Sequence, residues 1–326
     1  MNESEIRPQA IFDEYLRLAA NDADTYFGES ERIFVPCPAC KQVGKTAFVK
    51  AGFAYEHCES CLTLYVSPRP VAASFQKYYK EAPSVEFWAT HFYRETAEAR
   101  REKLWKPKAQ KVSEILAEHA AQQSTVVDIG GGYGIFIEEL QRLGHKSSII
   151  IEPGPMLAEV CKAKGLTVIE KFLEEIDVTE LPSSPKAFVS FELFEHLYDP
   201  ESFFLDLHKL MQNGDLFVFT TLSGSGIDIQ VLWENSKSVS PPHHLNFFNP
   251  SSVKLILERT GFEQIQVTTP GQLDMDILRN NVNFINDRFW KTVIQHSDDA
   301  VLDEWQSFIV EKKLSSHMMV VCRAKK

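Results

Sequence analysis

The stretch from Val126 to Leu140, VVDIGGGYGIFIEEL, decides the fold. A short apolar run ends at Asp128, turns through four glycines and continues with helical spacing. A glycine turn between a strand and a helix is a common place for a bound dinucleotide or phosphate. The residues around the turn therefore have to indicate what this one holds.

Three interpretations of the turn fit poorly. A phosphate-binding P-loop requires Lys-Ser/Thr after its last glycine, and none follows here. The dinucleotide pattern GxGxxG is met by Gly130 and Gly132 but fails at Ile135. Glycines that serve only a tight turn are the third interpretation, and Asp128 argues against it because it lies where a strand end would face a ligand.

An acidic strand end followed by GGGYG resembles the first motif of class I S-adenosylmethionine-dependent methyltransferases. The resemblance implies that the glycines let the backbone approach the cofactor, while the Asp128 carboxylate holds its ammonium group, directly or through water. It also explains why the loop has no Lys or Arg, since this cofactor carries no phosphate.

The resemblance extends over residues 123–326. Glu152, 24 residues after Asp128, matches the acid that accepts the ribose hydroxyls, and Phe172 and Leu173 fall where the family covers the adenine. The third-strand loop lacks the Asp that often binds the adenine amine. The residues thereby assigned to the cofactor are Asp128, Gly130, Gly131, Gly132, Tyr133, Gly134, Glu152, Phe172, Leu173 and Phe191.

Strands and helices alternate after Ser124, which favours a parallel sheet with helices on both faces. We expect a Rossmann-like α/β sheet, mostly parallel with an antiparallel last strand, and one or two helices inserted before that strand. The predicted division is a helical segment at 1–35, a zinc ribbon at 36–70, a helical linker or cap at 71–122 and the methyltransferase domain at 123–326.

Four of the six cysteines form two CxxC pairs, Cys37/Cys40 and Cys58/Cys61, separated by seventeen residues. This spacing is typical of a zinc ribbon, and a segment this short has too little core to fold unaided. Four thiolates leave no open coordination position, so we expect one structural Zn²⁺. Ordinary buried cysteines are the alternative.

Two groups of methyltransferases carry a ribbon of this kind. Some ribosomal-RNA enzymes use it to grip RNA, whereas a second group, with YVSPRP-like and YY-containing segments, acts on sugars or other small metabolites. Residues 65–70 and Tyr78-Tyr79 resemble the second group. The net charge of −11 argues against a nucleic-acid partner, so O-methylation of a small molecule such as a sugar or surface-glycan precursor is the leading hypothesis. RNA methylation and a non-catalytic adaptor are the alternatives.

The segment ELFEH follows the fourth strand, where the acceptor must approach. Glu192, Glu195 and His196 have the spacing of one side of a helix turn, and similar segments bind Mg²⁺ in small-RNA 2′-O-methyltransferases and ubiquinone-pathway O-methyltransferases. His244 would complete such a set. The alternative is a metal-free acceptor site, in which His196, His243 or His244 acts as the base.

Between Arg94 and Lys111 there are seven Lys/Arg against three Glu. This cluster either meets an anionic acceptor or forms a solvated helix face. No run of about 18 apolar residues and no signal-peptide core is present. We therefore expect a cytoplasmic protein with no membrane partner, and the sequence gives no oligomeric state.

Overall fold

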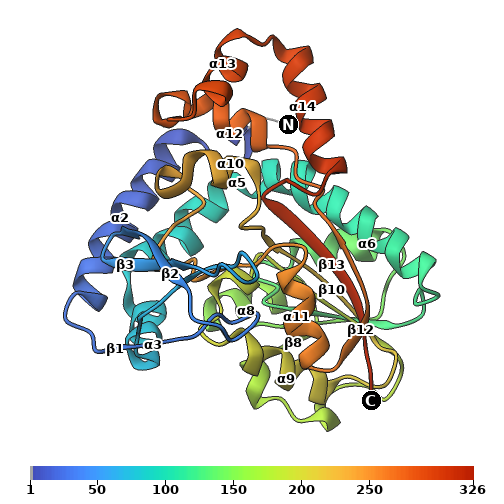
Figure 1. Cartoon of the computed structure of the whole chain (residues 1–326). Helices are drawn as coiled ribbons and strands as arrows, with labels where there is room; N and C mark the ends of the chain where they lie inside the picture. The colour runs from blue at the N-terminus through green and yellow to red at the C-terminus, as the bar shows by residue number, and fades with distance from the viewer. Residues whose placement is uncertain (1–2) are drawn as a thin grey trace.

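A computed structural model describes residues 3–326 of the chain (Figure 1). At its centre lies a seven-stranded sheet in the order β12-β13-β10-β9-β6-β7-β8. The strand β13 runs antiparallel to both of its neighbours, β12 and β10, whereas β10, β9, β6, β7 and β8 pair in parallel. This confirms the Rossmann-like sheet with an antiparallel last strand. The strands are β6 (Thr125–Ile129), β7 (Ser148–Ile151), β8 (Val168–Ile169), β9 (Lys186–Phe191), β10 (Leu216–Leu222), β12 (Phe262–Thr268) and β13 (His317–Ala324).

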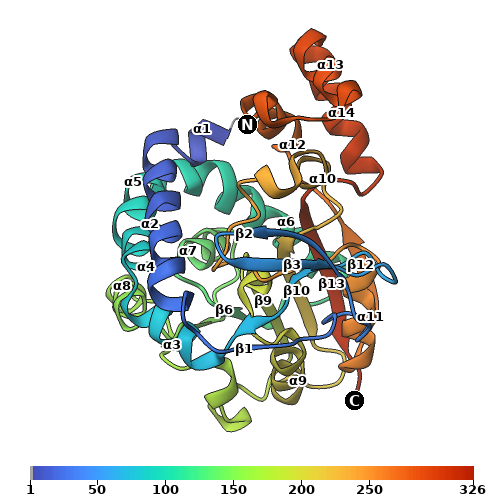
Figure 2. The same ribbon diagram turned by 60° about the vertical axis from the view of Figure 1, so that its left-hand side comes forward.

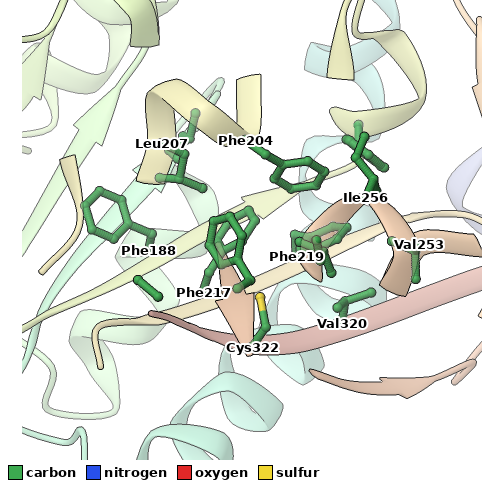
Figure 3. Close-up of a cluster of buried hydrophobic side chains, with 14 of the residues drawn as sticks. Phe188, Phe204, Leu207, Phe217, Phe219, Val253, Ile256, Val320 and Cys322 are labelled. Atoms are coloured by element: carbon green, nitrogen blue, oxygen red, sulfur yellow. The ribbon is translucent and has the colours of Figure 1, made fainter. Parts of the chain in front are cut away.

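Alternate residues of the central strands point to opposite faces, and each face is covered by helices. On one face, Phe188, Phe217 and Phe219 pack with α9 and α11, as Figure 3 shows. On the other face, Val126 and Val218 pack with α6, α7 and α8. These helices are α6 (Lys106–Glu118), α7 (Ile135–Arg142), α8 (Pro155–Ala163), α9 (Pro200–Leu210) and α11 (Ser252–Arg259).

The chain before β6 contributes a group of helices. In Figure 2 the long helix α2 runs beside α4 and α5 along one side of the molecule. Two short π-helical segments, η1 and η2, connect α4 to α5 and α5 to α6. The elements are α1 (Glu3–Ile6), α2 (Gln9–Phe27), α3 (Ala72–Glu81), α4 (Pro83–Phe87), η1 (Trp88–Phe92), α5 (Tyr93–Arg100) and η2 (Arg101–Trp105).

The cysteine-containing segment forms a small antiparallel sheet in the order β11-β4-β3-β2. Its fourth strand, β11, comes from far along the chain and pairs with β4 through Asn246↔Tyr65 and Phe247↔Leu64. The segment is therefore joined to the part of the chain that contains the main sheet by backbone hydrogen bonds. The strands are β2 (Lys45–Lys50), β3 (Phe53–His57), β4 (Leu64–Val66) and β11 (Asn246–Phe247), with β1 (Arg32–Ile33) and β5 (Arg69–Pro70) paired beside them.

Three helices are inserted between β12 and β13 and stand away from the main sheet in Figure 1. One or two were expected, and α14 is the addition. They are α12 (Asp274–Asn280), α13 (Arg288–His296) and α14 (Asp299–Glu311), with the 3₁₀ turn η7 (Val282–Phe284) after α12. The remaining elements are η3 (Leu173–Glu175), η4 (Val178–Glu180), η5 (Phe194–His196), α10 (Ile227–Leu232) and η6 (Trp233–Asn235). Within residues 3–326, no helix combines the length and apolar character needed to cross a membrane.

Two buried carboxyl groups meet where α10 contacts α12. Asp274 accepts hydrogen bonds from Ser315 Oγ (2.7 Å), Ser316 N (2.7 Å) and Gln306 Nε2 (2.8 Å). Asp228 is fully buried, and neither of its carboxyl oxygens has a hydrogen-bond partner among the described residues. Burial, and after it the charge of Asp274, raises the pKa of Asp228 to about 8. Asp228 is therefore the protonated member of the pair at neutral pH.

This protonation makes the stability of the fold depend on pH. The unfolded chain gives up the Asp228 proton near the ordinary pKa of about 3.9, whereas the folded chain keeps it up to about pH 8. Stability should therefore fall as pH rises through this window. We expect Asp228→Asn, which mimics the protonated carboxyl, to be more stable than wild type by about 1 kcal/mol or more at alkaline pH, with a smaller difference in acid. Urea unfolding across this range measures the effect, with the exposed Asp303→Asn as control. An equal shift in both variants would contradict this assignment.

Candidate active site

The glycine turn follows β6 at the carboxyl edge of the main sheet, where open α/β sheets bind ligands. Gly130, Gly132 and Gly134 have φ values of +73°, +54° and +70°, which side-chain-bearing residues rarely adopt. A Cβ on Gly131 would lie 2.7 Å from Ile150 Cγ2 and 2.9 Å from Asp128 Oδ2. Gly130, Gly131 and Gly132 thus keep a backbone surface beside Asp128, and Gly134 is the N-cap residue of α7.

Two acids lie together at this edge. Glu152 accepts hydrogen bonds from the backbone N–H groups of Gly132 and Gly154, each at 2.9 Å. Burial, and after it the charge of Glu152, raises the pKa of Asp128 to about 8, although Lys108 acts in the opposite direction. Two adjacent buried carboxyl groups suit a ligand that carries a positive charge and hydroxyl groups, which is the chemistry of the expected cofactor.

The remaining residues assigned to the cofactor differ in how far their side chains are exposed and in what they contact. Phe172 is 56% exposed, whereas Leu173 is 6% exposed and packs into the core between the sheet and α9. Phe191 is buried against Phe136. Tyr133 stacks on Tyr93 of α5, with ring centroids 4.4 Å apart and an interplanar angle of 5°.

The helices before β6 are fastened over the glycine turn. Tyr133 donates its hydroxyl hydrogen to the Ala89 carbonyl in η1. Arg101 of η2 binds Glu139 at 2.6 Å and Glu138 at 2.9 Å, both on α7. These contacts hold the helical segment above the edge of the sheet.

Three of the four predicted catalytic residues converge. Ligand atoms of Glu195, His196 and His244 all lie within 4.8 Å of one another, and we call these three residues the histidine cluster. His244 Nδ1 lies 2.6 Å from the Ser238 carbonyl oxygen, so Nδ1 carries the proton and Nε2 keeps its lone pair. Burial lowers the pKa of His196, and that of His244 to about 4, so both rings are neutral at physiological pH.

Glu195 differs from an ordinary carboxylate. It is 2% exposed and accepts a hydrogen bond from Thr221 Oγ1 at 2.8 Å. Burial, and after it the charge of Glu192, raises the pKa of Glu195 to about 8. The third candidate base, His243, lies outside the histidine cluster and contacts the Tyr78 hydroxyl through Nε2 at 2.5 Å.

Glu192 does not share a helix turn with Glu195 and His196, as its spacing had suggested. Its φ is +53°, and the 3₁₀ turn η5 begins only at Phe194. Glu192 instead faces Lys108 Nζ at 3.1 Å and Thr220 Oγ1 at 2.6 Å. Although burial raises it, the pKa of Glu192 is lowered overall by the charges of His317 and Lys108 and by the Thr220 hydrogen bond. His317 Nδ1 lies 3.5 Å from Glu192, and burial lowers the pKa of His317.

Residues 236–245, the histidine loop, are held by three strands of the cysteine-containing segment, β2, β3 and β4. Lys50 Nζ in β2 donates to the Ser236 carbonyl at 2.8 Å. The Tyr55 hydroxyl in β3 donates to the His244 carbonyl at 2.8 Å, and the Val66 N–H in β4 donates to the Leu245 carbonyl at 2.9 Å. The loop that carries His243 and His244 therefore takes its shape from the cysteine-containing segment.

The four cysteines of the two CxxC pairs form a compact group. Their sulfur atoms all lie within 4.8 Å of one another, with Cys37–Cys61 at 3.5 Å and Cys40–Cys58 at 3.4 Å. Tetrahedral Zn–S bonds of about 2.3 Å imply sulfur separations in this range, so the group fits a zinc ion. Cys37 and Cys58 belong to the same buried cluster as Val253 and Ile256 of α11.

Several residues near this edge were not predicted from the sequence. Thr220 and Thr221 lie near the end of β10, and the strand-end argument used for Asp128 could have found them. His317 starts β13 opposite Leu222, at the same edge because β13 is antiparallel to β10. No sequence pattern pointed to Arg7, which lies between α1 and α2.

Comparisons with known proteins agree with this geometry. Residues 93–267, more than half of the chain, match a family model described as a methyltransferase domain. The chain therefore belongs to this family, and with its sheet and glycine turn it is an S-adenosylmethionine-dependent methyltransferase of class I. Among curated proteins, none matches its sequence.

Solved structures with a similar arrangement are distant in sequence. An S-adenosylmethionine-dependent methyltransferase from Archaeoglobus fulgidus is 17% identical, with 66% of this chain and 94% of that chain covered and a TM-score of 0.40. Phosphoethanolamine N-methyltransferase 2 from Haemonchus contortus, in complex with phosphomonomethylethanolamine and S-adenosylhomocysteine, is 15% identical. Its match covers 80% of this chain and 62% of that chain, with a TM-score of 0.49. These likenesses carry no information on the acceptor of this protein.

The raised pKa of Asp128 predicts a proton linkage. At pH 7 the free carboxyl is mostly protonated, while the cofactor ammonium requires the carboxylate, so binding of S-adenosylhomocysteine should release a proton. Calorimetry in buffers of different ionisation enthalpy measures this release. We expect Asp128→Asn to abolish it and to weaken binding at least about tenfold, or about 1.4 kcal/mol. The exposed Glu159→Gln serves as control. Unchanged affinity in Asp128→Asn would remove Asp128 from the cofactor site.

Proposed function

We propose that this methyltransferase transfers the methyl group to an oxygen of a small molecule, such as a sugar or a surface-glycan precursor. The observation that carries the proposal is the position of the histidine cluster. Glu195 and His196 follow β9 at the same edge as the glycine turn, and His244 joins them from a loop that β2, β3 and β4 hold. Methyl transfer requires the acceptor, the methyl group and the sulfur to be in line, and an acceptor held at this edge beside the glycine turn would meet this requirement.

The histidine cluster supplies groups that orient and deprotonate a hydroxyl. Neutral His244 offers the Nε2 lone pair as a hydrogen-bond acceptor, because Nδ1 donates to Ser238. Glu195, with its raised pKa, exchanges a proton near neutral pH and is therefore suited to take up the hydroxyl proton. Glu192, paired with Lys108, contributes a fixed negative charge beside them.

A divalent ion at the histidine cluster is a second possibility that one observation favours. Two imidazoles and one carboxylate within 4.8 Å form a set of three metal-ligating groups. This donor set suits Zn²⁺ or Fe²⁺ better than Mg²⁺, which prefers oxygen ligands. A bound ion would lower the pKa of an acceptor hydroxyl.

We propose that the four cysteines hold one structural Zn²⁺ and that the ribbon shapes the acceptor site instead of gripping RNA. Cys37 and Cys58 are turned into the core against α11. Arg259 of α11 donates to the carbonyl oxygens of Ala39 (2.6 Å) and Pro38 (2.9 Å). Residues 36–70 have only four Lys/Arg against two acids, a weak charge for holding RNA.

The metal content and the role of the ribbon are tested together. We expect one zinc per chain by elemental analysis of protein purified without chelator. Cys58→Ser should lower methyl transfer at least tenfold because the histidine loop loses its support, while S-adenosylhomocysteine affinity stays within about threefold of wild type. Absence of zinc would contradict the metal site, and full activity of the variant would contradict the supporting role. Buried Cys322→Ser in β13, a thiol outside the two CxxC pairs, is the matched control.

The class of acceptor is tested with labelled S-adenosylmethionine and a cell extract. We expect label in the small-molecule ultrafiltrate and none in purified RNA. Glu195→Gln and His244→Ala should each reduce this label at least tenfold, with cofactor binding retained, whereas half-buried His208→Ala on α9, outside the histidine cluster, should not. Label confined to RNA would overturn the proposal.

Chelation distinguishes the two chemistries at the histidine cluster. If the cluster acts without metal, activity should survive a chelator that leaves the ribbon zinc in place, as checked by elemental analysis. Loss of activity that returns on adding Zn²⁺, Fe²⁺ or Mg²⁺ would assign the ion and favour the metal-assisted route.

A further inference from the structure

Two arginines of the N-terminal helical segment form no ion pair with the described residues. Arg100, the last residue of α5, is 8% exposed, and Arg7 lies between α1 and α2. Within residues 3–326, the buried Nε atoms of both side chains have no hydrogen-bond partner. No carboxylate of the described residues lies within 4.0 Å of either guanidinium.

The rest of the basic cluster is different. Its other members either form ion pairs or are exposed, so the cluster as a whole is not a site. Arg101 binds Glu138 and Glu139, Lys103 binds Glu5, and Lys108 binds Glu192. Lys106 pairs with Glu102 of η2, Lys111 pairs with Glu114 of α6, and Arg94 is exposed. Arg100 alone among the seven is buried without an acid.

Packed aromatic rings connect the two guanidinium groups with the two parts of the candidate site. Arg100 Cζ lies 5.4 Å from the centre of the Tyr93 ring, and Tyr93 stacks on Tyr133 of the turn. Arg7 Cζ lies 5.5 Å from the centre of the Phe12 ring. Phe12 stacks on Tyr15, whose ring centre is 5.4 Å from that of His243 in the histidine loop. The helix α1, which ends just before Arg7, contacts α5, which ends at Arg100.

Buried charges without partners are costly in a folded protein, and they are retained where a ligand supplies the opposite charge. A guanidinium presents its N–H groups as a planar fork that matches the oxygens of a carboxylate or phosphate. Because Lys108 is already paired with Glu192, the guanidinium groups of Arg7 and Arg100 leave an excess of positive charge beside this pair. The complementary group is an anion.

We propose that Arg7 and Arg100 bind a carboxylate or phosphate of the methyl acceptor and so select an anionic substrate. This inference rests on the proposed function, because it takes the histidine cluster as the place of transfer. The carboxylate of the cofactor is the other source of the same chemistry. Arg7 argues for the acceptor, because it packs through Phe12 and Tyr15 toward His243 of the histidine loop.

The test measures inorganic phosphate binding to the full-length protein saturated with S-adenosylhomocysteine, by calorimetry and thermal shift. No acceptor and no catalysis are needed, so the result is independent of whether the proposed function is correct. The variants are Arg7→Gln and Arg100→Gln, with Arg7→Lys and Arg100→Lys retaining the charge. Arg17→Gln on exposed α2 surface and Lys106→Gln are the matched controls.

We expect phosphate to bind wild type and both controls, and to bind each Gln variant at least tenfold more weakly. The Lys variants should fall between these values, and S-adenosylhomocysteine affinity should change less than threefold in every variant that melts like wild type. Equal phosphate affinity in wild type and the Gln variants would overturn the proposal, as would no phosphate binding by wild type. A tenfold loss of S-adenosylhomocysteine affinity in the Gln variants would assign the arginines to the cofactor carboxylate instead.

Discussion

The acceptor side of this enzyme depends on the buried guanidinium of Arg69. It donates to the Val66 carbonyl (2.9 Å), to Asn246 Oδ1 (2.5 Å) and to the Tyr198 carbonyl. These three acceptors lie in the ribbon, in β11 and just after the histidine turn η5. One side chain of the YVSPRP segment thus fixes the ribbon, the histidine loop and the segment after β9 relative to one another. The arginine of the YVSPRP segment therefore has a structural role. A Lys in place of Arg69 could not form the same planar set of hydrogen bonds.

Electrostatics divide the carboxyl edge of the sheet into two regions. Asp128 and Glu152 form an acidic region under the glycine turn, where burial and mutual repulsion raise the pKa of Asp128. On the other side of β9, Lys108 and Glu192 form an ion pair. Arg7 and Arg100 add two guanidinium groups whose Nε atoms have no hydrogen-bond partner among the described residues. The acidic region suits the positive charge of the cofactor, and the basic region suits an anionic acceptor. Placing opposite charges on the two sides orients both molecules for an in-line transfer.

The sequence predicted those parts of the structure that local patterns determine. Alternating apolar strands and helices fixed the sheet, and the strand ends at Asp128 and Glu152 lie together as expected. The CxxC spacing brought four sulfur atoms together. Contacts between distant segments were not predictable in this way. The pairing of β4 with β11 joins residues about 180 positions apart, and Arg7 reaches its place only through the packing of α1 against α5. Glu192 lies outside the helix turn that its spacing predicted, because its side chain binds Thr220 and Lys108 in the folded state.

The central claim is that the cofactor site and the histidine cluster face one space, enclosed by the ribbon and the N-terminal helices. A crystal structure with bound S-adenosylhomocysteine tests it most directly through the position of the sulfur atom. The account predicts that the ligand lies along residues 130–134, with its ribose on Glu152 and its sulfur directed toward Glu195 and His244. A sulfur atom that points away from the histidine cluster, or a ligand bound elsewhere on the sheet, would contradict it.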